Sequence, residues 1–154
     1  MWSHCAHPIR FELEEYKTID PEKFGWPERI EREETLNQMA KAFWSPTTLL
    51  VVTTGRFREE MAHSKSWFFS STWLAATLPP TEGNPGISVI PVQPVMDTIA
   101  PHEFGHYLGL DHDKARSNLM HDTIDFSRRK LTLEQCDQAT RALESPLLKP
   151  ILRN

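Results

Sequence analysis

The sequence predicts one mixed domain, of the α/β or the α+β class, from three observations. The first half of the chain alternates between short segments with the apolar periodicity of strands and one long amphipathic helix. The second half changes to helical periodicity. The chain has 154 residues, which is enough to bury one hydrophobic core and leaves little room for a second domain.

The composition excludes several classes of protein. Hydrophobic residues make up 39% of the chain and charged residues 25%, which are ordinary values for a soluble globular protein. No apolar run approaches the ~20 residues of a membrane-spanning helix, and the start of the chain lacks the basic and apolar segments of a secretory signal. The net charge of -4 argues against nucleic-acid binding, which normally requires a basic face. We therefore expect neither a membrane span nor a nucleic-acid partner.

The first two elements are a strand and a helix. Residues 9–16 alternate between apolar and polar side chains, which is the period of a half-buried strand. Pro27 suits the first turn of a helix, which we expect to run to Trp44. One face of this helix is apolar and should pack on the core. That face carries Leu36, Met39, Ala40 and Phe43.

Three strand regions should follow this helix. Residues 47–54 contain a run at 49–52 that is apolar on both faces, so we expect a central strand, parallel to the first. Residues 67–78 are aromatic and β-branched enough for one or two more strands. The prolines and glycines of residues 79–86 predict a turn-rich connection. Residues 87–92 predict another short strand, and the nearby prolines place it at a sheet edge or at its end.

The residues that carry chemistry gather in the next helix. The chain there reads H-E-x-x-H-x-x-G-x-x-H. On a helix His102 and His106 lie one turn apart, so both imidazoles can face one metal ion. Gly109 can end the helix, because glycine tolerates the left-handed conformation, and the chain can then return His112 as a third ligand. Three nitrogen ligands with an open fourth position predict a catalytic zinc site.

Two further residues test this interpretation. Glu103 directly follows the first ligand, so it can reach a zinc-bound water without binding the metal itself. Pro101 is compatible with the helix if Asp97 or Thr98 is its cap, because a proline in the first turn costs little or no backbone hydrogen bonding.

A methionine downstream completes the pattern. Met120 follows His112 at a spacing that lets a tight turn place its side chain beneath the metal site. The extended motif with this methionine resembles the metzincin clan of zinc endopeptidases, and H-E-F-G-H-x-L-G-L-D-H is similar to the matrixins. The likeness is most specific over residues 102–120. It implies three zinc ligands, a general base and a Met-turn: His102, His106, His112, Glu103 and Met120.

The resemblance also implies a fold. It is an α+β domain with a twisted mixed sheet of about five strands, two long helices including the zinc-binding helix, a Met-turn and a C-terminal helix. Residues 131–143 match that last helix, and residues 73–80 resemble the antiparallel edge strand that lines the matrixin substrate cleft. We interpret residues 1–154 as a single catalytic domain, with residues 1–8 as a flexible N-terminus.

Some features depart from the matrixin pattern. Asp113 stands where matrixins usually have a small residue, and no P-R-C-G cysteine switch is present. Residues 55–66 lack the set of His and Asp ligands with which animal matrixins hold a second zinc and calcium. We therefore expect one catalytic Zn²⁺ in a monomeric endopeptidase that acts on protein or peptide substrates. The alternative is a non-catalytic zinc-binding interaction module or an inactive protease homologue, against which the intact Glu103 argues.

The chain has only two cysteines, Cys5 and Cys136. In the matrixin fold the segment before the first strand can lie close to the C-terminal helix, so the resemblance makes a bridge between them possible. The alternative is two reduced thiols, with Cys136 as a small buried residue on the face that carries Leu133, Ala139 and Leu143.

Several other polar residues receive ordinary interpretations. Residues 4–7 should be a solvated N-terminus, with metal binding by this tail or by Cys5 as the alternative. Asp113 should be a turn residue or orient a neighbouring group, and His121 should line the cleft or lie at the surface. Residues 128–130 should form a solvated turn, with a preference for acidic substrates as the alternative. We assign no catalytic role to Tyr107, which faces away from His102 and His106.

Overall fold

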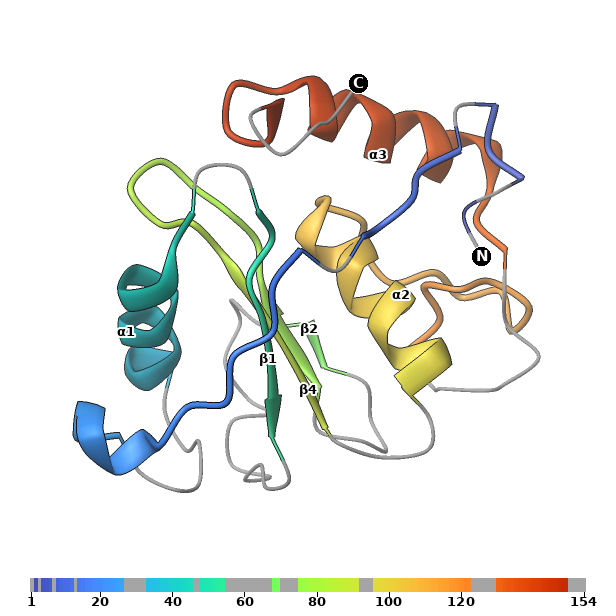
Figure 1. Ribbon diagram of the computed structural model, residues 1–154. Helices are drawn as coiled ribbons and strands as arrows, with labels where there is room; N and C mark the ends of the chain where they lie inside the picture. Colours follow the sequence, from blue (N-terminus) through green and yellow to red (C-terminus); the bar gives the residue numbers. More distant parts are fainter. Residues whose placement is uncertain are drawn as a thin grey trace.

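The structure is a computed structural model of residues 1–154, and it describes residues 2, 4–6, 8–12, 14–26, 33–45, 48–54, 68–69, 75–91, 96–122 and 130–149. It belongs to the α+β class, as predicted, with helices and strands arranged as in Figure 1. In chain order the elements are η1 (Pro21–Phe24), α1 (Glu33–Phe43), β1 (Val51–Thr54), β2 (Phe68–Phe69), β3 (Ala76–Leu78), β4 (Ile87–Pro91), α2 (Met96–Tyr107) and α3 (Leu133–Glu144).

The strands form one mixed sheet in the order β1-β4-β3-β2. β4 pairs in parallel with β1 and antiparallel with β3, and β2 pairs antiparallel with β3. A tight turn in which Thr81 and Asn84 exchange backbone hydrogen bonds joins β3 to β4, so the predicted turn-rich connection is confirmed. The described residues contain four strands, and the expected number of about five stays a prediction.

The positions of three strands in the sheet differ from expectation. In the described sheet β1 lies at the end instead of the centre, and its parallel partner is β4. β4 lies in the interior of the described sheet. Pro91 is compatible with this position because it is the last residue of the strand. β3, predicted as a cleft-lining edge strand, is covered by β2 and is therefore also interior.

The predicted strand at residues 9–16 is wrong over its described part, which contains no strand. Phe11 packs against Trp2 and against Phe104 of α2, with ring centroids 5.9 and 4.5 Å apart. Phe11 therefore contacts a helix and a second aromatic ring, and no described residue of this segment pairs with a strand. This segment is drawn in blue in Figure 1.

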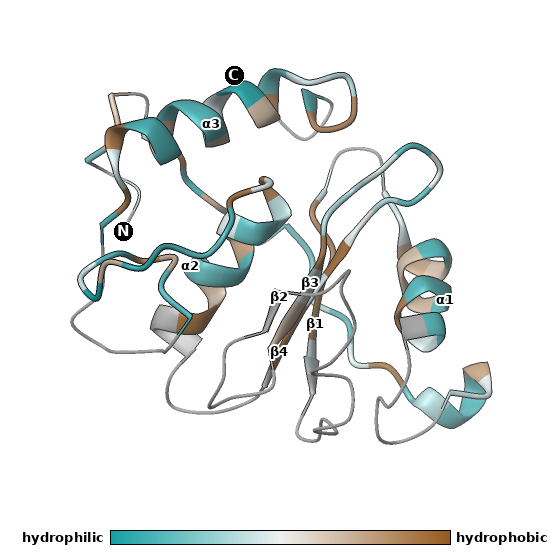
Figure 2. Cartoon of the chain, turned by 180° about the vertical axis from the view of Figure 1, so that it is seen from behind, coloured by the Kyte–Doolittle hydropathy of each residue, from teal (hydrophilic) through white to brown (hydrophobic). Residues whose placement is uncertain are grey.

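The helices α1 and α2 lie on opposite sides of the sheet (Figures 1 and 2). On one side the predicted apolar face of α1 is confirmed, because Leu36, Met39 and Ala40 are buried and Phe43 is partly buried. On the other side α2 packs on β3 and β4. Side chains alternate accordingly, so that Ala76 and Leu78 of β3 join the α1 side of the core, and Thr77 faces α2.

α3 confirms the predicted C-terminal helix and packs with the start of the chain. Cys136, Ala139 and Leu143 are buried on its inner face, whereas Leu133, the first residue of the helix, is 73% exposed. A disulfide joins Cys5 to Cys136, with Cα atoms 5.5 Å apart. Trp2 and Cys5 are buried in the same apolar cluster, so the expectation that residues 4–7 are solvated is wrong for Cys5. Figure 2 shows that most of the residues of α3 are hydrophilic.

Among the described residues, no helix combines the length and the apolar content that crossing a bilayer requires.

Candidate metal centre

The helix α2 carries two of the three predicted metal ligands. It begins at Met96, so the prediction that Asp97 or Thr98 caps it is wrong, and Pro101 lies in the second turn instead of the first. A proline there has no N–H to donate to the carbonyl of residue 97. The helix loses a single hydrogen bond in this way and continues through the motif.

The end of α2 reverses the chain toward the third ligand. Gly109 adopts the left-handed conformation, with a φ of 78°, as predicted. Its N–H donates to the carbonyl of His106, and the N–H of Leu110 donates to the carbonyl of Gly105, both at 2.9 Å. These two bonds form a Schellman motif, which satisfies the last carbonyls of the helix. The chain beyond it returns His112 to the face of the helix that carries the other two histidines.

The three histidines predicted from the sequence meet at one point. His106 Nε2 lies 3.0 Å from His102 Nε2 and 3.2 Å from His112 Nε2. His102 and His106 are buried, and His112 is exposed. Two of the three candidate ligands are therefore shielded from solvent, and the third lies at the surface.

Backbone carbonyls fix the tautomer of the two buried rings. His102 Nδ1 donates to the carbonyl of Leu119 at 2.8 Å, and His106 Nδ1 donates to the carbonyl of Leu110 at 2.7 Å. A carbonyl can only accept, so the proton of each neutral ring is on Nδ1 and the lone pair of each Nε2 points to the shared position. This is the usual arrangement of histidine ligands, in which the second nitrogen is held by an outer partner.

The donor set fits a zinc ion. Three nitrogens at 2.0–2.1 Å from a tetrahedral zinc would lie about 3.3 Å from one another, close to the separations observed here. Burial, together with the neighbouring His102, lowers the pKa of His106 to about 2, and burial also lowers the pKa of His112. The imidazoles are therefore neutral, which is the form that binds metal.

Glu103 directly follows His102 on α2 and is not part of this group. Its side chain is fully buried, and Oε2 accepts a hydrogen bond of 2.7 Å from Thr77 Oγ1 on β3. Oε1 is buried and has no hydrogen-bond partner among the described residues. Burial raises the pKa of this carboxyl to about 8, although the bond from Thr77 acts in the opposite direction. The contact with Thr77 joins residues far apart in the sequence, and no sequence pattern indicated it.

Met120 packs beneath the helix, as the Met-turn implied. It is fully buried, and its sulfur is so close to Gly105 that a Cβ added there would overlap it. Asn118 holds the turn, because its Oδ1 accepts from the N–H of Met120 at 2.7 Å and its Nδ2 donates to Gln135 of α3 at 2.8 Å. Sequence reasoning missed this role of Asn118 and Gln135, since it too depends on a long-range contact.

The other polar residues singled out in the sequence mostly make ordinary structural contacts. The hydroxyl of Tyr107 donates to the carbonyl of Pro85 at 2.7 Å, and burial raises its pKa to about 12. Asp113 is a turn residue whose Oδ1 accepts from the N–H of Ala115 at 2.7 Å. His121 is partly buried and paired with Asp122 at 2.8 Å. Residues 55–66 and 128–129 lie outside the described residues.

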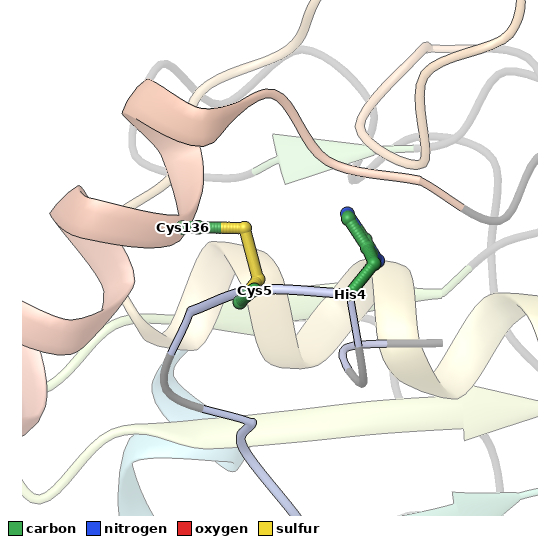
Figure 3. Close-up of side chains that lie close together, drawn as sticks. All are labelled: His4, Cys5 and Cys136. Carbon is green, nitrogen blue, oxygen red and sulfur yellow. A yellow bond between two sulfur atoms is a disulfide. The ribbon is translucent and has the colours of Figure 1, made fainter.

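A second group of metal-binding residue types lies at the junction of the N-terminus and α3. It contains His4, Cys5 and Cys136, shown in Figure 3. The two sulfur atoms are bonded to each other, so neither is a thiolate that could bind a metal. The alternative in which Cys5 is a zinc ligand is therefore wrong for this structure. His4 instead holds the chain before α3, because its Nε2 lies 3.1 Å from both the backbone nitrogen and the carbonyl oxygen of Leu131 and bonds to one of them according to its tautomer.

Comparison with known protein families gives one match. The family described as Matrixin matches residues 9–142, which is most of the chain and includes α1, the sheet, the histidine group, Met120 and nearly all of α3. No curated protein and no solved structure matches.

Proposed function

Because this chain belongs to the matrixin family of zinc metalloproteases, we propose that it is a zinc-dependent endopeptidase that hydrolyses peptide bonds in proteins or peptides. The observation that carries the proposal is the convergence of three imidazole Nε2 atoms, together with the buried carboxyl of Glu103, which directly follows the ligand His102 on α2. We further propose that the chain is a single catalytic domain over residues 1–154 and acts as a monomer.

His102, His106 and His112 would hold one zinc ion through Nε2, with the fourth position left for water or substrate. When bound, zinc lowers the pKa of the attacking water to about 7 and polarises the carbonyl of the scissile bond. The carbonyls of Leu110 and Leu119 keep the two buried rings in the orientation that this requires.

Glu103 would act as the general base. Its carboxylate takes a proton from the attacking water and returns that proton to the nitrogen of the leaving amine. Its environment supports this role, because Oε1 is buried with no hydrogen-bond partner among the described residues and can accept a proton there.

The test compares Glu103→Gln with Glu22→Gln, a matched change at an exposed glutamate of η1. We expect Glu103→Gln to retain zinc, because the three imidazoles remain, and to lower peptide hydrolysis by about 10²–10⁴-fold, as for a lost general base. Glu22→Gln should leave both unchanged. His106→Ala should lose zinc together with activity, because two ligands hold the ion less well than three.

Cleavage of a peptide library with and without a chelator provides the activity readout. If Glu103→Gln cleaves peptides as fast as the parent chain, the general-base role is wrong. If the parent chain binds zinc and cleaves no peptide in the library, a zinc-binding interaction module replaces the endopeptidase as the proposed function.

The metal content gives an independent prediction. The described residues contain two groups that could hold a metal ion, and the two sulfurs of one group are bonded to each other, so we expect one zinc per chain. Elemental analysis of the purified oxidised protein after dialysis measures this ratio. Two tightly held zinc ions per chain would contradict the prediction and indicate a ligand group outside the described residues.

A further inference from the structure

A chain of three buried polar groups connects the sheet to Glu103. Ser88 Oγ on β4 lies 3.0 Å from Thr77 Oγ1 on β3, and Thr77 Oγ1 lies 2.7 Å from Glu103 Oε2. All three residues are fully buried. Thr77 and Ser88 are direct partners in the antiparallel register of β3 and β4, so their side chains share the face of the sheet that α2 covers.

The hydroxyls of Thr77 and Ser88 lie among apolar side chains. Their neighbours on the same face are Ala75 and Ile90, which pack with apolar residues of α2. Valine has nearly the shape of threonine and would fill the position of Thr77 without a buried polar atom. Burying a hydroxyl is unfavourable unless it is hydrogen-bonded, so packing alone does not account for two hydroxyls here.

The direction of the hydrogen bonds follows from the carboxylate. An ionised carboxylate can only accept, so Thr77 donates its single hydroxyl proton to Glu103 Oε2. Thr77 Oγ1 then accepts from the hydroxyl of Ser88. Ser88 thereby orients the hydroxyl of Thr77, and Thr77 orients the carboxylate.

The two oxygens of Glu103 are left in different situations. Oε2 is held by Thr77, whereas Oε1 is buried with no donor among the described residues. A buried acceptor without a donor is costly, and an attacking water would supply the missing one. We propose that Thr77 is a positioning residue, which, supported by Ser88, fixes Oε2 so that Oε1 takes the proton of the attacking water. This inference rests on the proposed endopeptidase function.

The experiment compares Thr77→Val, Thr77→Ser and Ser88→Ala with a matched control, Thr140→Val. Thr140 lies on α3, where its hydroxyl bonds to the carbonyl of Cys136. We expect Thr77→Val to lower kcat by about 10- to 100-fold with KM and zinc content unchanged, because a misdirected base slows the chemical step and not binding. Thr77→Ser keeps the hydroxyl and should restore most of kcat. Ser88→Ala should lower kcat by less than Thr77→Val, and Thr140→Val should leave it unchanged.

A second readout does not depend on activity. In protein with ¹³C-labelled glutamate carboxyls, the resonance of Glu103 is the one missing from Glu103→Gln. It should shift in Thr77→Val and return close to its original position in Thr77→Ser. Adding Thr77→Val to Glu103→Gln should cause no further loss of hydrolysis, because the hydroxyl acts through the carboxylate.

The outcomes separate this inference from the proposed function. If hydrolysis depends on Glu103 but Thr77→Val keeps the full kcat, the positioning role is wrong and the endopeptidase stands. If hydrolysis does not depend on Glu103, the positioning role of Thr77 and the general-base role of Glu103 are both wrong. If Thr77→Val does not fold, a kcat for Ser88→Ala equal to that of the parent chain, with an unshifted Glu103 resonance, would overturn the inference.

Discussion

At the scale of single residues, the absence of one side chain shapes the metal centre. Gly105 lies on α2 between His102 and His106, and the sulfur of Met120 occupies the space that a Cβ would fill. Met120 is fully buried, so its side chain is surrounded by packed neighbours, and its backbone N–H is held by Asn118. The glycine therefore serves close packing here, because its backbone is helical and needs no special conformation.

We expect Gly105→Ala to destabilise the protein by roughly 1–3 kcal/mol, the usual cost of overfilling a core. This loss should exceed the gain of up to about 1 kcal/mol that alanine normally brings to a helix. Urea denaturation measures the free energy of unfolding of Gly105→Ala and of the parent chain. Combining Gly105→Ala with Met120→Ala should cost less than the sum of the two single changes, because the second substitution removes the overlap. A Gly105→Ala protein as stable as the parent would show that Met120 yields.

The sequence predicted the central residues of the site because their spacing is local. His102, Glu103 and His106 lie within two turns of one helix, where periodicity alone brings them together. Their partners could not be predicted in the same way. Thr77 comes from a distant strand, and the carbonyls of Leu110 and Leu119 belong to the backbone, which carries no residue-specific pattern.

At the scale of elements, the end of a helix was predicted well where a single residue determines it. Gly109 fixes the reversal after α2, and the spacing of apolar residues identified the buried faces of α1 and most of α3. Strand order was predicted poorly. The strands have only two to five residues, and the pairing of β1 with β4 joins segments that are distant in the sequence. The position of a strand in a sheet depends on such contacts and not on its own composition.

The end of α2 leads to a prediction about metal affinity. Gly109→Ala should cost roughly 1–2 kcal/mol, because a φ of 78° is unfavourable for a residue with a Cβ. It should also weaken zinc binding, since His112 follows directly from this turn. Gly25→Ala is the matched control: it has a φ of 67° after η1, and, as at Gly109, no atom lies within 4 Å of an added Cβ.

Competition with a chromogenic chelator measures zinc affinity, and urea denaturation measures stability. We expect both variants to lose similar stability and Gly109→Ala alone to lose zinc affinity. Equal zinc affinity in the two variants would mean that the turn does not position His112.

At the scale of the whole molecule, one apolar cluster connects the ends of the chain to the metal centre. It contains Trp2 and Cys5 from the N-terminus, Leu108 and Leu110 from the end of α2, Met120, and the inner face of α3. Gln138 of α3 also donates to the carbonyl of Gly109 at 2.7 Å, at the turn that leads to His112. The sequence wrongly predicted a strand at residues 9–16, and it did not predict this cluster. Both depend on where the N-terminal segment contacts the helices, which are distant from it in the sequence.

The disulfide between Cys5 and Cys136 closes almost the entire chain, with a sequence separation of 131. Closing so long a loop restricts the unfolded chain strongly, so we expect the double substitution Cys5→Ser with Cys136→Ser to lower the free energy of unfolding by about 2–5 kcal/mol. Urea denaturation of the zinc-loaded proteins measures the difference. A large excess of reductant should bring the parent chain close to the stability of the variant, since the parent then loses the same constraint. Titration of thiols in the unfolded, unreduced parent chain should find none, and two reactive thiols would show that the bridge is absent.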